Sequence, residues 1–140
     1  MALPKILVDS SFLYALFRKP DPDHLPVRAV FQTVKADFII PQVVLPEAAW
    51  LFNRAGGMPL VATFLDLLTA VQLPLESVTY TDVQRASELL RQYPNAKLDL
   101  VDCCIVALAE RLEITRVASL DRRDFSIMRT QAGGFLEILP

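Results

Sequence analysis

Residues 98–125 read LDLVDCCIVALAERLEITRVASLDRRDF, and this stretch decides the fold of the chain. Its apolar residues recur from Leu100 to Leu112 at the spacing of a helical face, which predicts a helix with one buried side. The residues of that face are Val101, Ile105, Leu108 and Leu112. The apolar run at 116–119 has the length of a short buried strand and ends just before Asp121. A helix that leads directly into such a strand is typical of an α/β fold.

Four aspartates border this helix and strand. Asp99 and Asp102 lie three residues apart, so they are neighbours on the first helical turn and would repel each other. The helix dipole relieves part of this repulsion, and a bound cation would relieve more of it. Asp99 is suited to cap the helix, whereas Asp102 lies further in and is the better candidate for a metal ligand. Asp121 and Asp124 follow the strand, in a turn that leads into the next predicted helix. We expect one of them to bind the metal ion and the other to cap that helix, with Asp121 favoured as the metal ligand.

The N-terminus repeats this arrangement of an apolar strand followed by an aspartate. Residues Lys5–Val8 predict an inner parallel strand, and Asp9 comes directly after it. In open parallel sheets, ligands bind beyond the carboxyl ends of the strands. If the two strands are neighbours, Asp9 and Asp121 would meet the aspartate pair of the helix. Such a set of carboxylates suits a hard divalent cation, so we expect Mg²⁺ or Mn²⁺.

Glu47 is a further acidic candidate, in a helix predicted at 43–52. Pro46 is tolerated only near the start of a helix, which places Glu47 in the first turns. The helix dipole alone favours a carboxylate there, so this role and a role as a metal ligand both stay open. Trp50 on the same helix is a candidate for core or interface packing.

Helices and short strands alternate through the rest of the chain. Further helices are expected at 12–17, at 27–34, at 60–70, from Thr81 to a break at 93–96, and at 125–129, with strands at 38–40, 75–79 and 135–139. Ser10 or Ser11 is expected to cap the first of these helices, and Thr81 its own helix. This order predicts an α/β three-layer sandwich with a mostly parallel central sheet flanked by helices. The length of 140 residues suits a single domain, 1–140.

The charge balance excludes a general nucleic-acid binder. The chain has 14 Lys and Arg residues against 16 Asp and Glu, a net charge of −2, which is not the basic footprint of that class. A nucleic-acid substrate would therefore need a local basic rim. The candidate residues are Arg54, Arg122, Arg123 and Arg129. Ordinary solvated surface explains these arginines equally well.

The few cysteines and the single histidine exclude a zinc site and a disulfide framework. Cys103 and Cys104 are adjacent in a helix and cannot bridge each other without strain, so buried free thiols are expected. Such cysteine usage is typical of a reducing compartment, which predicts a cytoplasmic protein. His24 is expected to face solvent. No apolar run approaches the roughly 20 residues that span a bilayer, so no membrane partner is expected.

Four motifs follow one another along the chain. They are VDSS at 8–11, VVLPEAAWLF at 43–52, LVDCCIVALAER at 100–111 and SLDRRDF at 119–125. In this order the set resembles PIN-domain proteins, most closely the VapC-type toxins of bacterial toxin–antitoxin pairs, and it covers essentially the whole chain.

The resemblance implies a metal-dependent ribonuclease with a cluster of acidic residues around Mg²⁺ or Mn²⁺. Carried over position by position, the acidic residues are Asp9, Glu47, Asp102 and either Asp121 or Asp124. Asp99 is an additional candidate for the metal. Ser11 matches the small hydroxyl residue that follows the first aspartate of the family. Cys103 and Cys104 depart from the small or apolar residues that are commoner at their positions, outside the acidic set.

The expected reaction is hydrolysis of RNA phosphodiester bonds by an endoribonuclease. Ser11, Arg122 and Arg123 are the candidate substrate-binding residues. The resemblance implies a cognate antitoxin as partner. The helix at 60–68 is apolar on more than one side and, with 50–52, is a candidate surface for the antitoxin or for a homodimer. The alternatives are a non-catalytic PIN-like interaction module and a phosphoacceptor receiver domain, although serines follow Asp9 where a receiver has a second acid.

Overall fold

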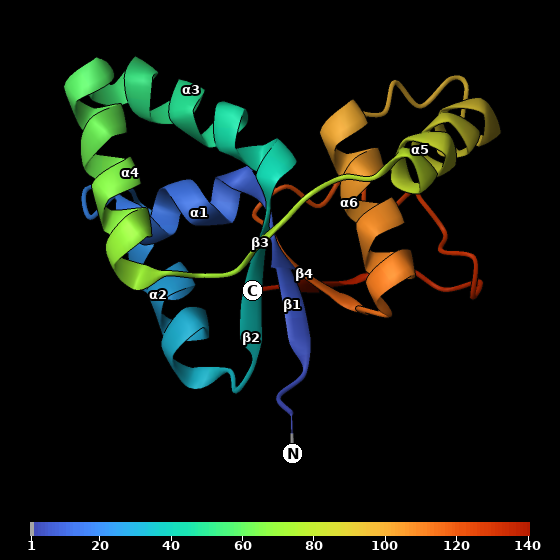
Figure 1. The fold of residues 1–140 in the computed structure, drawn as a ribbon, viewed down its shortest axis with the longest axis horizontal. Helices are drawn as coiled ribbons and strands as arrows, with labels where there is room; N and C mark the ends of the chain where they lie inside the picture. Colours follow the sequence, from blue (N-terminus) through green and yellow to red (C-terminus); the bar gives the residue numbers. More distant parts are fainter. Residues whose placement is uncertain (1) are drawn as a thin grey trace.

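A computed structural model describes residues 2–140 of the chain, and its centre is a sheet of five parallel strands (Figure 1). The strand order is β3-β2-β1-β4-β5, and every neighbouring pair is parallel. The strands are β1 (Lys5–Val8), β2 (Asp37–Pro41), β3 (Leu75–Glu76), β4 (Arg116–Ala118) and β5 (Glu137–Leu139). The predicted parallel sheet is therefore confirmed, and the strands predicted at 75–79 and 135–139 are shorter than expected.

Helices cover both faces of this sheet. They are α1 (Ser10–Phe17), α2 (His24–Thr33), α3 (Leu45–Gly56), α4 (Met58–Val71), α5 (Tyr80–Gln92) and α6 (Leu100–Leu112), with a 3₁₀ turn η1 (Gln42–Val44) before α3. Figure 1 shows α1 to α4 on one side of the strands and α5 and α6 on the other. The predicted three-layer sandwich is confirmed. Within residues 2–140, none of the helices combines the length and the apolar character needed to cross a bilayer.

The sequences of β1 and α6 are almost continuously apolar because both elements lie in the core. Ile6, Leu7 and Val8 are all buried, as expected for a strand that has helices on both faces. The helix α6 has the predicted bounds, but its buried surface is wider than one face. Every residue from 102 to 109 is buried, whereas the predicted core positions Val101 and Leu112 are only half-buried. The cause is enclosure, because α6 lies between the sheet and α5.

Two predicted helix caps are wrong. The residue that caps α1 is Asp9, whose Oδ1 accepts a hydrogen bond from the backbone N–H of Ser10, and neither Ser10 nor Ser11 takes this role. The residue that caps α5 is Thr79, which forms a reciprocal capping box with Asp82, and not Thr81. Several residues at each helix start are chemically able to cap, so the surrounding contacts decide which one does.

Two further predictions fail for tertiary reasons. His24 does not face solvent: its ring is buried, and its Nδ1 lies 2.8 Å from the carbonyl oxygen of Ala15, because the start of α2 packs on α1. Residues 125–129 do not form a helix. They form turns in which the backbone N–H of Met128 donates to the carbonyl of Asp124, while Phe125 and Met128 insert into the core. The thiols of Cys103 and Cys104 are free and buried, as predicted.

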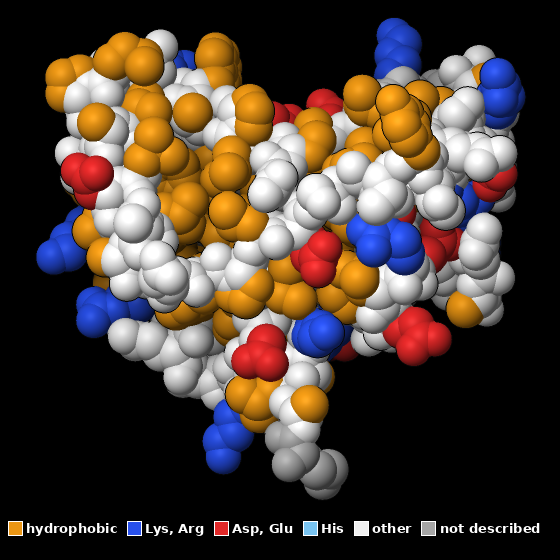
Figure 2. Space-filling model, viewed as in Figure 1, with side chains coloured by type: hydrophobic (Ala, Val, Ile, Leu, Met, Phe, Trp, Pro, Cys, Tyr) orange, Lys and Arg blue, Asp and Glu red, His pale blue; other side chains and the backbone are white. Residues whose placement is uncertain are grey.

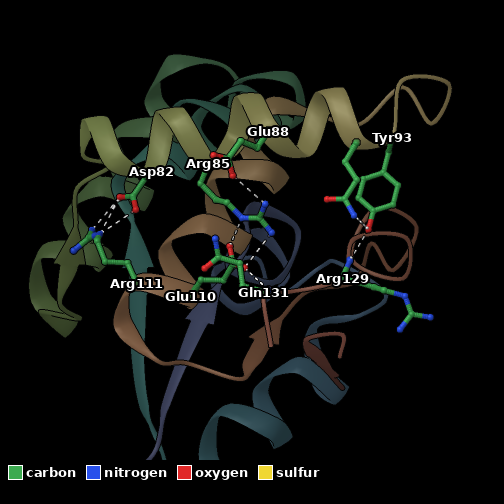
Figure 3. Close-up of polar contacts among 9 residues, drawn as sticks. Asp82, Arg85, Glu88, Tyr93, Glu110, Arg111, Arg129 and Gln131 are labelled. Atoms are coloured by element: carbon green, nitrogen blue, oxygen red, sulfur yellow. Dashed lines mark hydrogen bonds and ion pairs between the residues drawn. The ribbon is translucent and has the colours of Figure 1, made fainter. Parts of the chain in front are cut away.

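Ion pairs fasten α5 to α6 (Figure 3). The guanidinium of Arg85 donates to Glu110 at 2.8 Å, and that of Arg111 donates to Asp82 at 3.0 Å. Burial alone would raise the pKa of Asp82, but the hydrogen bonds from Arg111 and Thr79 outweigh it and lower the pKa. These contacts hold in place the helix that carries Asp102.

Candidate active site

Six carboxylate side chains meet in one cavity at the carboxyl ends of the strands. We call it the acidic cavity. It is lined by Asp9, Ser10, Ser11, Glu47, Lys97, Asp99, Asp102, Asp121, Arg123 and Asp124. In Figure 2 a notch at the top of the view, between the lobe of α3 and α4 and the lobe of α5 and α6, has acidic side chains at its floor.

The strand order brings these residues together. β1 and β4 are neighbours with Val8 opposite Ala118, and the backbone N–H of Asp9 donates to the carbonyl of Ala118 at 2.9 Å. The strand-end residue Asp9 and the loop that carries Asp121 therefore start from the same edge, as the sequence analysis required. The first turns of α3 and α6 supply Glu47 and the pair Asp99 and Asp102.

Two hydrogen bonds hold the carboxylate of Asp9 in place in the cavity. Only 4% of the residue is exposed, its Oδ1 accepts from the backbone N–H of Ser10 at 2.7 Å, and its Oδ2 accepts from the hydroxyl of Ser119 at 2.7 Å. Burial raises the pKa of Asp9, and these two hydrogen bonds offset the rise only in part. Sequence reasoning missed Ser119, although a hydroxyl residue at the end of a strand beside a predicted acidic site was a usable signal.

Asp102 is the residue with the most strongly perturbed titration. It is 7% exposed, and burial, the nearby charge of Asp9 and a hydrogen bond with the Asp124 carboxyl raise its pKa to about 9. Asp99 caps α6 as predicted, with its Oδ1 accepting from the backbone N–H of Val101 at 2.7 Å. At neutral pH Asp102 and the carboxylates beside it therefore retain a proton between them unless a cation replaces that proton.

Asp121 and Asp124 occupy different surroundings. Asp121 is exposed and its Oδ1 accepts from the backbone N–H of Arg123 at 3.2 Å. Asp124 is buried, and its oxygens accept from the backbone N–H of Asp99 at 2.8 Å and from the guanidinium of Arg123 at 2.5 Å. Asp124 ties the loop after β4 to the start of α6, and Asp121 lies at the open side. Both line the cavity, so both stay candidates for the fourth acidic position.

Glu47 reaches the cavity from the first turn of α3. Its Oε1 accepts from the hydroxyl of Ser10 at 3.2 Å. Burial raises the pKa of Glu47, and the charges of Asp99 and Asp9 raise it further. A carboxylate with a raised pKa is suited to accept a proton near neutral pH.

The basic side chains are distributed differently from the prediction. Of the four candidate arginines, Arg123 alone is among the residues that line the acidic cavity in the part of the chain described. Arg122 donates to the carbonyl of Pro140, while Arg54 and Arg129 lie over the rings of Trp50 and Phe135. Lys97, which the sequence analysis did not single out, is the second cation of the cavity.

Ser11 also lines the cavity, but its hydroxyl has a structural partner. The Ser11 Oγ accepts from the backbone N–H of Leu120 at 3.0 Å and lies 3.3 Å from the Ser119 Oγ. Ser11 thereby links the start of α1 to the end of β4. A direct contact of Ser11 with substrate remains a prediction.

The acidic cavity fits a hard divalent cation by its donor chemistry. Its carboxylate oxygens are the ligands that Mg²⁺ and Mn²⁺ prefer, and the crowding of acidic groups around Asp102 is the repulsion that a cation relieves. Within residues 2–140, no group of three or more acidic, cysteine or histidine side chains stands in an arrangement that could hold a metal ion as it is. Instead of facing a common point, the carboxylate oxygens of Asp9, Asp99 and Asp124 accept hydrogen bonds from backbone N–H groups.

The hydrogen bond from Ser119 yields a prediction about cation binding. Ser119→Ala removes the donor that lowers the pKa of Asp9, so Mg²⁺ affinity is expected to fall about 10-fold. Calorimetric titration with Mg²⁺ measures this change. Ser126→Ala is the control, because that exposed hydroxyl donates to the Arg122 carbonyl and does not line the cavity. Equal Mg²⁺ affinities for both variants would contradict the role given to Ser119.

The raised pKa of Asp102 predicts how stability depends on pH in a chelating buffer. The group titrates near 3.8 in the unfolded chain and near 9 in the folded one, so between these values the folded state holds a proton that the unfolded state has lost. The free energy of unfolding should therefore fall as the pH rises from about 5 to about 9, by a few kcal/mol in order of magnitude. Urea unfolding at several pH values measures the slope. Asp102→Asn should flatten it, and an equally steep slope in that variant would contradict the assignment.

Comparison with known proteins adds four findings. The family model of the PIN domain matches residues 6–130. Ribonuclease VapC26 of Mycobacterium tuberculosis is 24% identical over 135 residues, which cover 96% of this chain and 100% of the relative. The structure of M. tuberculosis VapC20, a sarcin-ricin loop cleaving toxin, matches with a TM-score of 0.80 at 22% identity, over 96% of this chain and 99% of that one. A toxin–antitoxin complex from Klebsiella pneumoniae matches with a TM-score of 0.65 at 16% identity, over 86% and 90% of the two chains.

Proposed function

The chain belongs to the PIN-domain family, and from this premise we propose that it is a metal-dependent endoribonuclease, the toxin of a toxin–antitoxin pair. The family resemblance inferred from the four motifs is thereby confirmed. The relatives VapC26 and VapC20 are by name a ribonuclease and a sarcin-ricin loop cleaving toxin, which supports RNA as the substrate class. The activity is assigned to one PIN-like domain, 1–140.

The observation that carries this proposal is the meeting of six carboxylates in the acidic cavity. Buried acidic groups that repel each other destabilise a fold. Their concentration at the carboxyl ends of the strands therefore indicates a functional site. The residues assigned to Mg²⁺ or Mn²⁺ are Asp9, Glu47, Asp102 and one or both of Asp121 and Asp124, with Asp99 at the edge of the set. A bound divalent cation supplies Lewis-acid stabilisation of the phosphate charge and acidifies a water molecule.

The side chains of this chain supply the remaining chemistry. Where the carboxylate of Glu47 is not bound to the cation, its raised pKa suits it to accept the proton of the attacking water. Lys97 and Arg123 offset the negative charge of the cavity and contact the phosphate of the RNA. Ser119 and the start of α1 orient Asp9. A serine or histidine nucleophile is not part of this mechanism.

The proposed partners are an antitoxin protein and a second copy of the chain. The helix α4 exposes Met58, Leu65, Leu67 and Val71, and Figure 2 shows apolar side chains gathered over α3 and α4. Val61, Phe64 and Phe52 turn into the core, so the docking surface is narrower than the predicted stretch. The matched Klebsiella structure is a toxin–antitoxin complex, which supports a protein partner of this kind. Cytoplasmic location is proposed from the free buried thiols.

The test of the proposed function is cleavage of RNA by the purified chain. End-labelled structured and single-stranded RNAs are incubated with Mg²⁺, and internal cuts are mapped on a sequencing gel. Internal cleavage with defined ends is expected. A chain that is folded, binds the antitoxin encoded beside it and cuts none of these RNAs would be the non-catalytic interaction module instead.

A further inference from the structure

An exposed tryptophan lies beside the acidic cavity. Trp50 follows Glu47 by three residues on α3, so the two side chains share one helix face. The Trp50 residue is 58% exposed, although large aromatic residues are usually buried. A second cavity, which we call the aromatic cavity, is lined by Ser10, Pro46, Glu47, Trp50 and Leu51 and has a volume of ≈ 470 Å³.

The two cavities are adjacent. Ser10 and Glu47 line both of them, and the hydroxyl of Ser10 donates to Glu47 at the boundary. A chain of nucleotides with one phosphate in the acidic cavity can therefore place a neighbouring base in the aromatic cavity. This adjacency to the acidic cavity favours a nucleic-acid occupant over a protein occupant for the Trp50 ring.

We propose that Trp50 is a stacking platform for an unpaired nucleobase of the RNA substrate, next to the phosphodiester that is cut. The inference rests on the proposed function and deepens it, because it restricts the substrate to RNA with an unpaired nucleotide beside the cleavage position. A base within a duplex has both faces covered by its neighbours, whereas a base in a loop or single strand offers a free face.

The chemistry of the aromatic cavity suits a base better than a phosphate. Pro46 and Leu51 give it apolar walls beside the indole, and among the described residues that line it Glu47 alone is charged. That carboxylate repels a phosphate but leaves the stacking of an uncharged base on the indole unaffected. Stacking on an aromatic face tolerates any base, so the platform selects for an unpaired nucleotide and not for a sequence.

Arg54 completes the site. Its guanidinium carbon lies over the Trp50 ring, 5.3 Å from the ring centre, so a positive charge covers one face of the indole and a base would stack on the other face. In this position Arg54 attracts the RNA backbone that leaves the acidic cavity. This contact gives a role to an arginine that the sequence analysis singled out and that does not line the acidic cavity.

Trp50 is the single tryptophan of the chain, so its fluorescence reports on the platform directly. The probes are a short oligoadenylate and an abasic ribose-phosphate oligomer of equal length and charge, each added with Mg²⁺ to an Asp102→Asn protein that cuts slowly. Quenching by oligoadenylate and not by the abasic oligomer is expected. Equal quenching by both, or quenching by neither, would overturn the platform.

Binding and kinetics of variants complete the test. Trp50→Ala should weaken binding of labelled oligoadenylate about 10- to 100-fold and raise the KM for RNA, Trp50→Phe should keep most of the affinity, and abasic binding should not change. Tyr80→Ala is the matched control, because Tyr80 is an exposed aromatic residue that lines neither cavity. Arg54→Gln should reduce the salt dependence of binding by about one phosphate contact.

The failures of the two proposals are distinguishable. If Trp50→Ala cuts RNA with an unchanged kcat/KM, the platform is wrong and the nuclease stands. If Trp50→Ala converts a dimer to a monomer in gel filtration while oligoadenylate leaves the native fluorescence unchanged, the ring belongs to a protein interface. If the native chain cuts no RNA with Mg²⁺, the nuclease itself is wrong.

Discussion

Asp102→Asn is expected to lower the rate of RNA cleavage by at least about 100-fold while the chain stays folded. Asparagine has the size of aspartate but carries no negative charge, so it weakens the hold on a divalent cation and the stabilisation of the phosphate that depends on it. Asp102 is buried next to Asp9 and Asp124, and burial raises its pKa strongly, so a neutral side chain suits this position when no cation is bound.

Two measurements separate lost catalysis from lost structure. Initial rates on an end-labelled RNA give the loss of activity, and the unfolding midpoint in chelating buffer gives the stability, which should equal or exceed that of the parent. Asp66→Asn is the control, because Asp66 is an exposed aspartate of α4 that does not line the acidic cavity. Cleavage by Asp102→Asn at the parental rate would mean that the acidic cavity is not the catalytic centre.

Removal of divalent cations is expected to abolish RNA cleavage, and Mg²⁺ or Mn²⁺ is expected to restore it. Without a cation the cavity combines six carboxylates with the two cations Lys97 and Arg123, and this excess of acidic groups repels an RNA phosphate. A bound divalent ion reverses the local charge that the phosphate meets.

The measurement is an RNA cleavage assay after dialysis against EDTA, followed by addition of each metal. EDTA that has been saturated with Mg²⁺ beforehand is the control for effects of the chelator itself. Titration calorimetry on the dialysed protein should show cation binding that is weaker in the Asp102→Asn variant. A full cleavage rate after thorough dialysis would rule out the metal-dependent mechanism. The two cations of the cavity, Lys97 and Arg123, would then have to stabilise the phosphate charge without a metal ion.

Strong local patterns explain which parts of the fold could be predicted. The helix α6 has the bounds that its apolar spacing predicted, and Asp99 caps it as expected. The apolar run of β1 predicted an inner strand. Successive side chains of a strand point to opposite faces of the sheet, so a continuous apolar run is buried only when helices cover both faces. Where two or three neighbouring residues can perform the same local role, as at the starts of α1 and α5, the prediction failed. His24 was misplaced because its burial depends on α1, which lies elsewhere in the sequence.

The sequence by itself determined the kinds of groups in the site: carboxylates at the ends of two apolar strands and in the first turns of two helices, in the order that marks the PIN-domain family. Only the tertiary structure decided which of them meet, because the convergence depends on β1 lying next to β4 and on the loop after β4 folding back to α6 through Asp124. It also decided that Ser119, Lys97 and Trp50 lie at the site, since their places depend on contacts between segments that are far apart in the sequence. Local spacing governs the periodicity of helices and strands, whereas a site is made by contacts between residues far apart in the chain.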